Sequence, residues 1–184
     1  RELDKAPTDQ TLPKYYRQSF VDYFQFVVWT GLRRTEALKL RWQDWSTDIE
    51  DGVSIGRIHV RAIEKGARKT EKPRIFKVHD KVNLLLQERR TRADYTKDTD
   101  YIFCHPKIAR KHLRRRNIKT MRNSFNKSME ACDLLYDNKG NKRTMYIGRH
   151  TNAHLSRQAG KPIDDIADDI GNLVSTAQRF YIGT

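Results

Sequence analysis

Apolar residues recur at helical spacing along most of this chain. Over residues 14–29 aromatic and β-branched side chains repeat every three or four positions, and Gly31 follows where such a helix would end. In residues 117–132 the apolar positions form a single stripe, which is typical of a helix with one buried face. The same spacing predicts further helices over residues 33–40, 82–88, 149–159, 163–170 and 175–181.

The spacing changes to two between residues 55 and 78. Ile58 and Val60 alternate with polar and basic residues, and a second apolar segment follows after a polar stretch. This pattern predicts two strands joined by a hairpin whose tip, residues 64–72, carries four basic side chains. Two short segments are also expected, an extended one at 101–104 and a turn at 137–142. The expected fold class is mainly α with a small antiparallel β-sheet, an α+β arrangement.

Length and net charge limit the number of domains and the class of binding partner. The 184 residues suffice for one domain with a buried core, so we expect a single domain over 1–184 with a polar lead-in over 1–12. Lys and Arg number 37 against 23 Asp and Glu, a net charge of +14 that attracts polyanions. Nucleic acid is therefore the leading partner. A membrane partner is not expected, because no window holds the roughly 18 apolar residues of a spanning helix.

Cysteine and histidine usage favours neither disulfides nor a metal. Cys104 and Cys132 are too few for a disulfide framework and lack zinc-site spacing. His150 and His154 are four residues apart but lack the intervening Glu of a zinc-protease motif. The start of the chain has no apolar core and is not typical of a signal peptide. We expect a cytoplasmic protein without a metal or other cofactor.

Four separated residues could together carry out chemistry on a phosphodiester: Arg33, Lys69, Arg149 and Tyr181. Two arginines can hold the non-bridging oxygens through bidentate hydrogen bonds, and a lysine can protonate a leaving oxygen. A tyrosine can act as the nucleophile. None of these steps needs a metal.

The surroundings of Arg33 add a family resemblance. Residues 30–44, TGLRRTEALKLRWQD, resemble the first conserved box of the tyrosine recombinases, also called phage integrases. The resemblance implies that Arg33 is catalytic and that Glu36 supports it. Arg34, the neighbouring residue, is expected to contact DNA.

The predicted hairpin carries the second match. Residues 69–78, KTEKPRIFKV, are similar to the family's hairpin, in which a catalytic lysine precedes a basic residue and an apolar strand. Lys69 is the preferred catalytic lysine. Lys65 and Lys72 remain alternatives because sequence does not determine the register of this hairpin, and both are expected to contact DNA.

The third match is residues 149–155, RHTNAHL, which resemble the family's second box. It implies that Arg149 is catalytic. Tyr146 occupies the position of the family's histidine and is also assigned to the catalytic group. A tyrosine there could donate a hydrogen bond to a phosphate oxygen, but its high reference pKa makes it a poorer base than imidazole. His150 is expected to be a supporting neighbour.

The fourth match, residues 171–181, GNLVSTAQRFY, is similar to the end of the family's catalytic domain. Tyr181 stands in the position of the nucleophile. Asn172 stands nine residues earlier, where the family has His or Trp, and is assigned to the catalytic group. Its amide can donate to a phosphate oxygen but cannot act as an acid or base at neutral pH.

The resemblance implies a site-specific DNA recombinase that cuts and rejoins double-stranded DNA through a 3′-phosphotyrosyl intermediate. It also implies a bacterial protein that is monomeric off DNA and tetrameric on two attachment sites. An amino-terminal DNA-binding domain would lie outside this chain. A basic cluster is expected to contact DNA phosphates: Arg110, Lys111, Arg114, Arg115 and Arg116.

Two other interpretations remain open. A recombinase-like fold could bind DNA without cutting it, with Tyr146 and Asn172 as the cause of weakened or lost activity. A type IB topoisomerase would share the chemistry and relax supercoiled DNA as a monomer.

Overall fold

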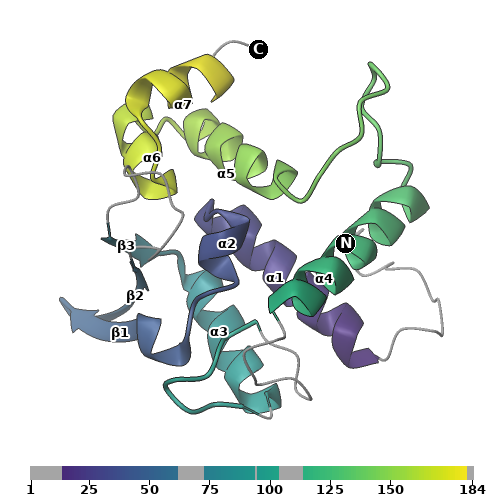
Figure 1. The fold of residues 1–184 in the computed structure, drawn as a ribbon. Helices are drawn as coiled ribbons and strands as arrows, with labels where there is room; N and C mark the ends of the chain where they lie inside the picture. The colour runs from purple at the N-terminus through teal and green to yellow at the C-terminus, as the bar shows by residue number, and fades with distance from the viewer. Residues whose placement is uncertain (1–13, 62–72, 94, 104–113, 182–184) are drawn as a thin grey trace.

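The computed structural model describes residues 14–61, 73–93, 95–103 and 114–181. Its helices and strands are joined in the order α1-α2-β1-β2-β3-α3-α4-α5-α6-α7, with one 3-10 turn, η2, between α2 and β1 (Figure 1). The helices are α1 (Lys14–Thr30), α2 (Arg34–Ala37), α3 (Asp80–Arg92), α4 (Arg114–Ala131), α5 (Ile147–Gln158), α6 (Ile163–Ile170) and α7 (Val174–Tyr181). The remaining elements are η2 (Trp42–Asp44), β1 (Trp45–Glu50), β2 (Val53–Val60) and β3 (Arg74–Val78). The predicted class, mainly α with a small antiparallel sheet, is confirmed.

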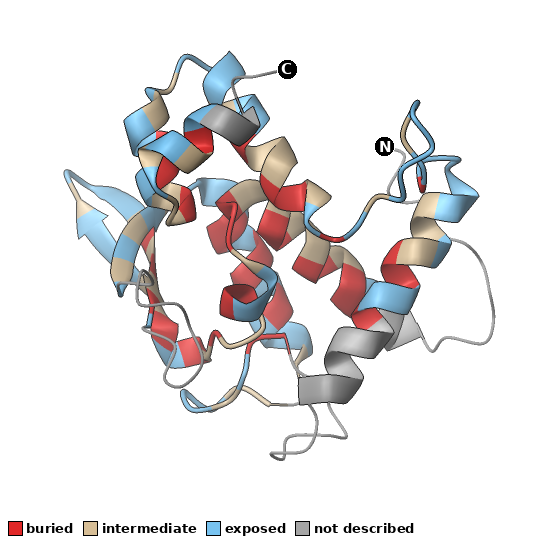
Figure 2. Ribbon diagram, turned by 45° about the horizontal axis from the view of Figure 1, so that its top comes forward, coloured by how far each residue is buried: buried red, intermediate tan, exposed pale blue. Residues whose placement is uncertain are grey.

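Helix α1 lies at the centre of the main core, where buried residues concentrate (Figure 2). Its buried rings Tyr23 and Phe26 both contact Phe103, with centroids 5.5 and 4.9 Å apart. The segment expected to be extended at 101–104 is instead a single bridge residue, Tyr101, followed by a turn, in which Ile102 and Phe103 are buried; Cys104 lies outside the described residues. None of the described helices is long and apolar enough to cross a membrane.

A buried ion pair joins α1 to α3. Arg89 donates from a terminal nitrogen to Oδ2 of Asp22 at 2.8 Å and from Nε to the carbonyl of Ile102 at 2.7 Å. Its other terminal nitrogen donates to the hydroxyl of Ser19 at 3.1 Å. A buried charge is tolerated only when it is paired and hydrogen-bonded, and these contacts meet that condition for Arg89.

The sheet has one strand more than the sequence pattern indicated. Its order is β1-β2-β3, antiparallel throughout, so β1 and β3 are the edge strands. The sequence of β1, WSTDIE, does not alternate apolar and polar residues, and its isoleucine, Ile49, is 80% exposed. Asp51 and Gly52 both have positive φ, as a two-residue type I′ hairpin turn requires. This Asp-Gly pair was the signal in the sequence that could have revealed β1.

The predicted helices are present, with some changes of length. Helix α6 has the predicted limits, whereas α3 is longer than the predicted 82–88. Helix α2 is much shorter than the predicted 33–40, because the chain after it pairs with the segment around Ile102. There the amide of Ile102 donates to the carbonyl of Leu40 at 2.9 Å.

A second, smaller core holds the last three helices together. Its buried residues are Ala153, Ile166, Ala167, Ile170 and Ala177, from α5, α6 and α7. Helix α5 also packs along α1, and Gly148 of α5 makes this possible, since a Cβ there would already lie 3.2 Å from Val27. Helices α6 and α7 are thereby connected to α1 through α5 (Figure 1).

Candidate active site

Gly31 directs the chain from α1 into the candidate site. Its φ of +66° is in the left-handed region that glycine favours. A Cβ at this position would lie 2.5 Å from Oδ1 of Asn152 and 2.7 Å from Ile170, so there is no space for a side chain. Two residues later Arg33 forms the N-cap of α2, with 24% of its side chain exposed.

Glu36 binds both the backbone and the side chain of Arg33. Its carboxylate accepts a hydrogen bond from the amide of Arg33 at 2.8 Å and another from a terminal nitrogen of that guanidinium at 3.2 Å. It also accepts two hydrogen bonds from Arg74 of β3, at 3.0 and 3.1 Å. Burial would raise the pKa of Glu36, but the hydrogen bonds and charges of Arg74 and Arg33 outweigh it and hold the pKa below its usual value. The carboxylate is therefore ionised at neutral pH, as a support for an arginine must be.

Arg149 reaches the same place from α5 and is only 1% exposed. One terminal nitrogen donates to the carbonyl of Gly31 at 2.8 Å, and the other donates to Oδ1 of Asn172 at 2.9 Å. Its Nε is buried and has no hydrogen-bond partner within the described part of the chain. Two hydrogen bonds therefore fix the guanidinium of Arg149 in the site, while its Nε–H donor is not used by the described residues.

Both predicted catalytic arginines converge on Asn172. A terminal nitrogen of Arg33 donates to Oδ1 of Asn172 at 3.0 Å, and so this one oxygen accepts from Arg33 and Arg149 together. The same nitrogen of Arg33 donates to the carbonyl of Gly171 at 2.6 Å. Gly171 ends α6 with a φ of +64°, which turns the chain so that Asn172 faces the arginines. Two guanidinium groups that hold one oxygen between them form a site suited to an anion.

Tyr146 and His150 lie beside Arg149. Tyr146 is the residue before α5, is 44% exposed and has its ring 5.9 Å from the Arg149 guanidinium carbon. Its ring meets the imidazole of His150 edge-on, with centroids 4.9 Å apart. Burial, and then the charge of Arg149, lower the pKa of His150. His150 is thus a neutral imidazole at physiological pH, next to the position where the family's histidine would stand.

Other predicted site residues are not described at the level of side chains. Lys65, Lys69, Lys72, Arg110 and Lys111 lie outside the described residues. Arg114, Arg115 and Arg116 form the first turn of α4, and Tyr181 is the last residue of α7. Arg34, the first residue of α2, is exposed.

Sequence reasoning missed one residue of the site, Arg74. In the sequence Arg74 is only the basic residue of the second match, KTEKPRIFKV, whereas the structure places its guanidinium against Glu36 and the end of α6. The sequence could not reveal the contact between Arg74 and Glu36, because the two residues are 38 positions apart.

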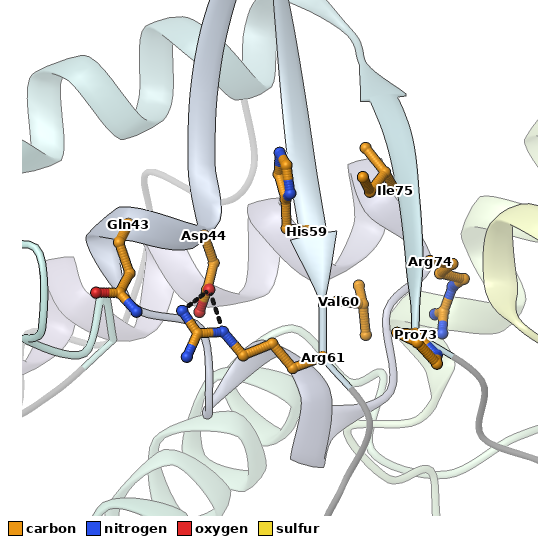
Figure 3. A pocket seen from close by; sticks show the side chains of 8 residues that line it. All are labelled: Gln43, Asp44, His59, Val60, Arg61, Pro73, Arg74 and Ile75. Atoms are coloured by element: carbon orange, nitrogen blue, oxygen red, sulfur yellow. Dashed lines mark hydrogen bonds and ion pairs between the residues drawn. The ribbon is translucent and has the colours of Figure 1, made fainter.

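A hollow opens next to the site at the ends of β2 and β3 (Figure 3). Arg61 crosses it to pair with the buried carboxylate of Asp44, at 2.6 Å from Nε. Arg74 stands at the far edge of the hollow. The lining is completed by Gln43, His59, Val60, Pro73 and Ile75.

Comparison with known proteins decides the family. The model of the phage integrase family matches residues 3–172 of this chain. The chain belongs to the phage integrase family. The matched range includes Arg33, Glu36, Arg74, Arg149 and Asn172. No curated protein matches the chain.

Solved structures of phage integrases and related recombinases share the fold. The XerH site-specific recombinase bound to difH substrate aligns with a TM-score of 0.67 and 21% identity, covering 100% of this chain and 47% of that chain. A lambda integrase dimer bound to a COC′ core site aligns at 0.64 and 15% identity, covering 98% and 45%. The Tn1549 transposon integrase in complex with transposon right end DNA aligns at 0.62 and 18% identity, covering 98% and 58%. This chain spans about half the length of those proteins, and its fold is that of their catalytic domains.

Proposed function

We propose that this chain is the catalytic domain of a site-specific DNA recombinase, which cuts and rejoins double-stranded DNA through a covalent 3′-phosphotyrosyl intermediate. The observation that carries the proposal is the convergence of Arg33 and Arg149 on one oxygen atom, Oδ1 of Asn172, at 3.0 and 2.9 Å. Each arginine lies in a segment that resembles a catalytic box of the family. A non-bridging oxygen of the scissile phosphate would take the position of that amide oxygen.

The two arginines would bind the phosphate and stabilise the transition state. A phosphodiester carries a full negative charge, so its hydrogen bonds to guanidinium are stronger than those of a neutral amide. During displacement at phosphorus, charge builds up on the equatorial oxygens, where preorganised cations are most effective. Arg149 is preorganised by its bond to the Gly31 carbonyl, and Arg33 by its bonds to Glu36.

Tyr181 would be the nucleophile. Its phenol loses its proton to solvent as the phenolic oxygen attacks phosphorus and forms the O–P bond, while the bond from phosphorus to the 5′ oxygen breaks and Lys69 gives that oxygen a proton. The ester is conserved as a 3′-phosphotyrosine, and the 5′ hydroxyl of another strand reverses the step. Helix α7 supports this role, because its Ala177 is buried against α5 and α6, the helices next to both arginines. Lys65 and Lys72 remain the alternatives to Lys69.

Tyr146 and Asn172 would complete the phosphate contacts in place of the family's histidine and its His or Trp. The phenol of Tyr146 can donate to a phosphate oxygen, and the amide nitrogen of Asn172 can do the same once its side chain turns away from the arginines. No metal or other cofactor takes part in these steps.

Binding and assembly complete the proposal. The net charge of +14 favours DNA, and Arg34 with the basic residues at 110–116 would contact backbone phosphates. The longer recombinases aligned above were solved on DNA. We infer that the complete protein adds an amino-terminal DNA-binding domain and acts in the bacterial cytoplasm. It would be a monomer off DNA and a tetramer on two attachment sites.

A second function, DNA binding without cleavage, has one observation in its favour. In this structure the amide of Asn172 occupies the position proposed for the phosphate, and neither Asn172 nor Tyr146 offers the acid–base chemistry of imidazole.

Covalent trapping on nicked random duplexes tests these alternatives. The full-length protein is incubated with the duplexes, denatured in SDS, and the protein-bound DNA is sequenced. We expect an adduct with the wild type and none with Tyr181→Phe, while DNA affinity stays nearly the same. No adduct from the wild type, with salt-sensitive binding retained, would favour the non-cleaving function. Relaxation of a supercoiled plasmid without strand exchange would instead favour a topoisomerase.

A further inference from the structure

We infer that Arg74 is a positioning residue of this site, which shares the carboxylate of Glu36 with Arg33 and so keeps the Arg33 guanidinium directed at the phosphate. The inference rests on the proposed function and adds a residue to it. The first observation is that Arg74 pairs with Glu36, the carboxylate that also binds Arg33. Arg33 is one of the two arginines that converge on Asn172.

The contact between Arg74 and Glu36 is bidentate. The two terminal nitrogens of Arg74 donate to the two carboxylate oxygens, at 3.0 and 3.1 Å. The side chain of Glu36 is 2% exposed and that of Arg74 is 16% exposed, so solvent screens the pair little. Parallel donation by a planar guanidinium defines the plane of the carboxylate, which the single ammonium of a lysine cannot do.

Arg74 also reaches the end of α6. Its Nε donates to the carbonyl of Asp169 at 3.3 Å, and a Cβ on Gly171 would lie 2.7 Å from its guanidinium carbon. Gly171 in turn accepts from Arg33 at 2.6 Å. One side chain of β3 therefore contacts both supports of Arg33, the carboxylate of Glu36 and the turn that ends α6.

The charges around Glu36 explain why a second arginine must compete with Arg33 for its carboxylate. Arg33, Arg74 and Arg149 bring three positive charges, and Glu36 is the carboxylate that pairs with Arg33 and Arg74. If Arg74 were neutral, both oxygens of a buried carboxylate would be left to Arg33 alone, and a bidentate pair would draw its guanidinium away from the phosphate position. With Arg74 present, Arg33 gives Glu36 one side-chain hydrogen bond and keeps its other terminal nitrogen for Asn172 or the phosphate.

The test compares Arg74→Gln and Arg74→Lys with Arg61→Gln in the full-length protein. Arg61 is a control because it also pairs with a buried carboxylate at the same hairpin, but that carboxylate belongs to Asp44 and not to Glu36. With DNA saturating, we expect cleavage to fall about 10- to 100-fold in Arg74→Gln, by analogy with the loss when outer partners of metal ligands are removed. The Kd for DNA should change less than threefold. Arg74→Lys should recover part of the rate, and Arg61→Gln should leave it unchanged.

A double-mutant cycle separates positioning from general stability. If Arg74 acts through Glu36, then Arg74→Gln should add less than about a twofold loss in a Glu36→Gln background, because coupled residues are not additive. Equal losses in both backgrounds, or equal losses of rate in Arg74→Gln and Arg61→Gln, would overturn the inference.

A readout without cleavage keeps this test independent of the proposed function. The Nε–H signal of Arg33, assigned with Arg33→Lys in ¹⁵N-labelled protein, reports the environment of the guanidinium. It should shift in Arg74→Gln and stay in place in Arg61→Gln. If the wild type forms no adduct with DNA, the proposed function fails while this signal still decides the role of Arg74. An unmoved signal in Arg74→Gln would refute that role.

Discussion

At the scale of single residues, a few polar contacts bring the candidate site together. Glu36 fixes Arg33, the carbonyl of Gly31 fixes Arg149, and the amide oxygen of Asn172 joins the two guanidinium groups. A neutral amide is well suited to this position, because it satisfies both donors without a charge and can give way to a phosphate. The identity of residue 172 therefore affects how readily the site accepts DNA.

Substitution of Asn172 tests this point. Asn172→Asp keeps the shape of the side chain but places a negative charge between two arginines, where it competes with the phosphate. We expect DNA affinity to fall at least about tenfold, since a like charge at a binding position costs several kcal/mol. Asn172→Ala removes the competing oxygen and also the amide that would donate to the phosphate, so it should bind DNA more tightly than Asn172→Asp. Fluorescence anisotropy with a labelled duplex measures both, and equal affinity of Asn172→Asp and the wild type would contradict this role.

At the scale of elements, the turns matter as much as the helices. Helix α2 has only four residues, and its position depends on the turn at Gly31 before it and on the pairing of the following chain with the segment around Ile102. Helical spacing predicted most helices well because it reports a local property, the alignment of apolar side chains on one face. It overestimated α2 because tertiary pairing ends that helix early. It missed β1 because an exposed edge strand needs no apolar alternation.

Gly31 and Gly140 form a matched pair for testing the first turn. Both have positive φ, but a Cβ on Gly140 meets nothing within 4 Å, whereas one on Gly31 lies 2.5 Å from Asn152. Gly140→Ala should cost about 1–2 kcal/mol of stability from backbone strain alone. Gly31→Ala should cost about 2–5 kcal/mol, because overpacking adds about 1–3 kcal/mol. Urea unfolding followed by circular dichroism gives both values, and equal losses would show that the space around Gly31 is not tight.

At the scale of the whole molecule, the basic residues divide between structural ion pairs and expected contacts with DNA. The net charge is +14, yet the buried ion pair of Arg89 and Asp22 and the pairing of Arg61 and Arg74 with buried carboxylates use several cations for structure. The basic residues at the start of α4 are among those expected to contact DNA. The electrostatic part of binding should therefore depend steeply on salt.

Removing three charges from the first turn of α4 tests that expectation. The triple variant Arg114→Gln, Arg115→Gln, Arg116→Gln should weaken DNA binding at low salt and make log Kd less dependent on log salt. Each lost phosphate contact lowers the slope by about 0.9. Cleavage at saturating DNA should change little, because these residues are proposed to bind the backbone and not the scissile phosphate. An unchanged slope, measured by anisotropy between low and physiological salt, would exclude them from the interface.

The sequence by itself determined the helical class, the lysine hairpin region and the resemblance of four separated segments to one family. Those features depend on local spacing and on residue identity, which a single chain displays directly. Only the tertiary structure decided that Arg33 and Arg149 meet at Asn172 and that Arg74 shares Glu36 with Arg33. Asn172 is 139 residues from Arg33 and 23 from Arg149, and contacts over such separations depend on how α1, α5 and α6 pack together. That packing is a collective property of the two hydrophobic cores, which no local pattern contains.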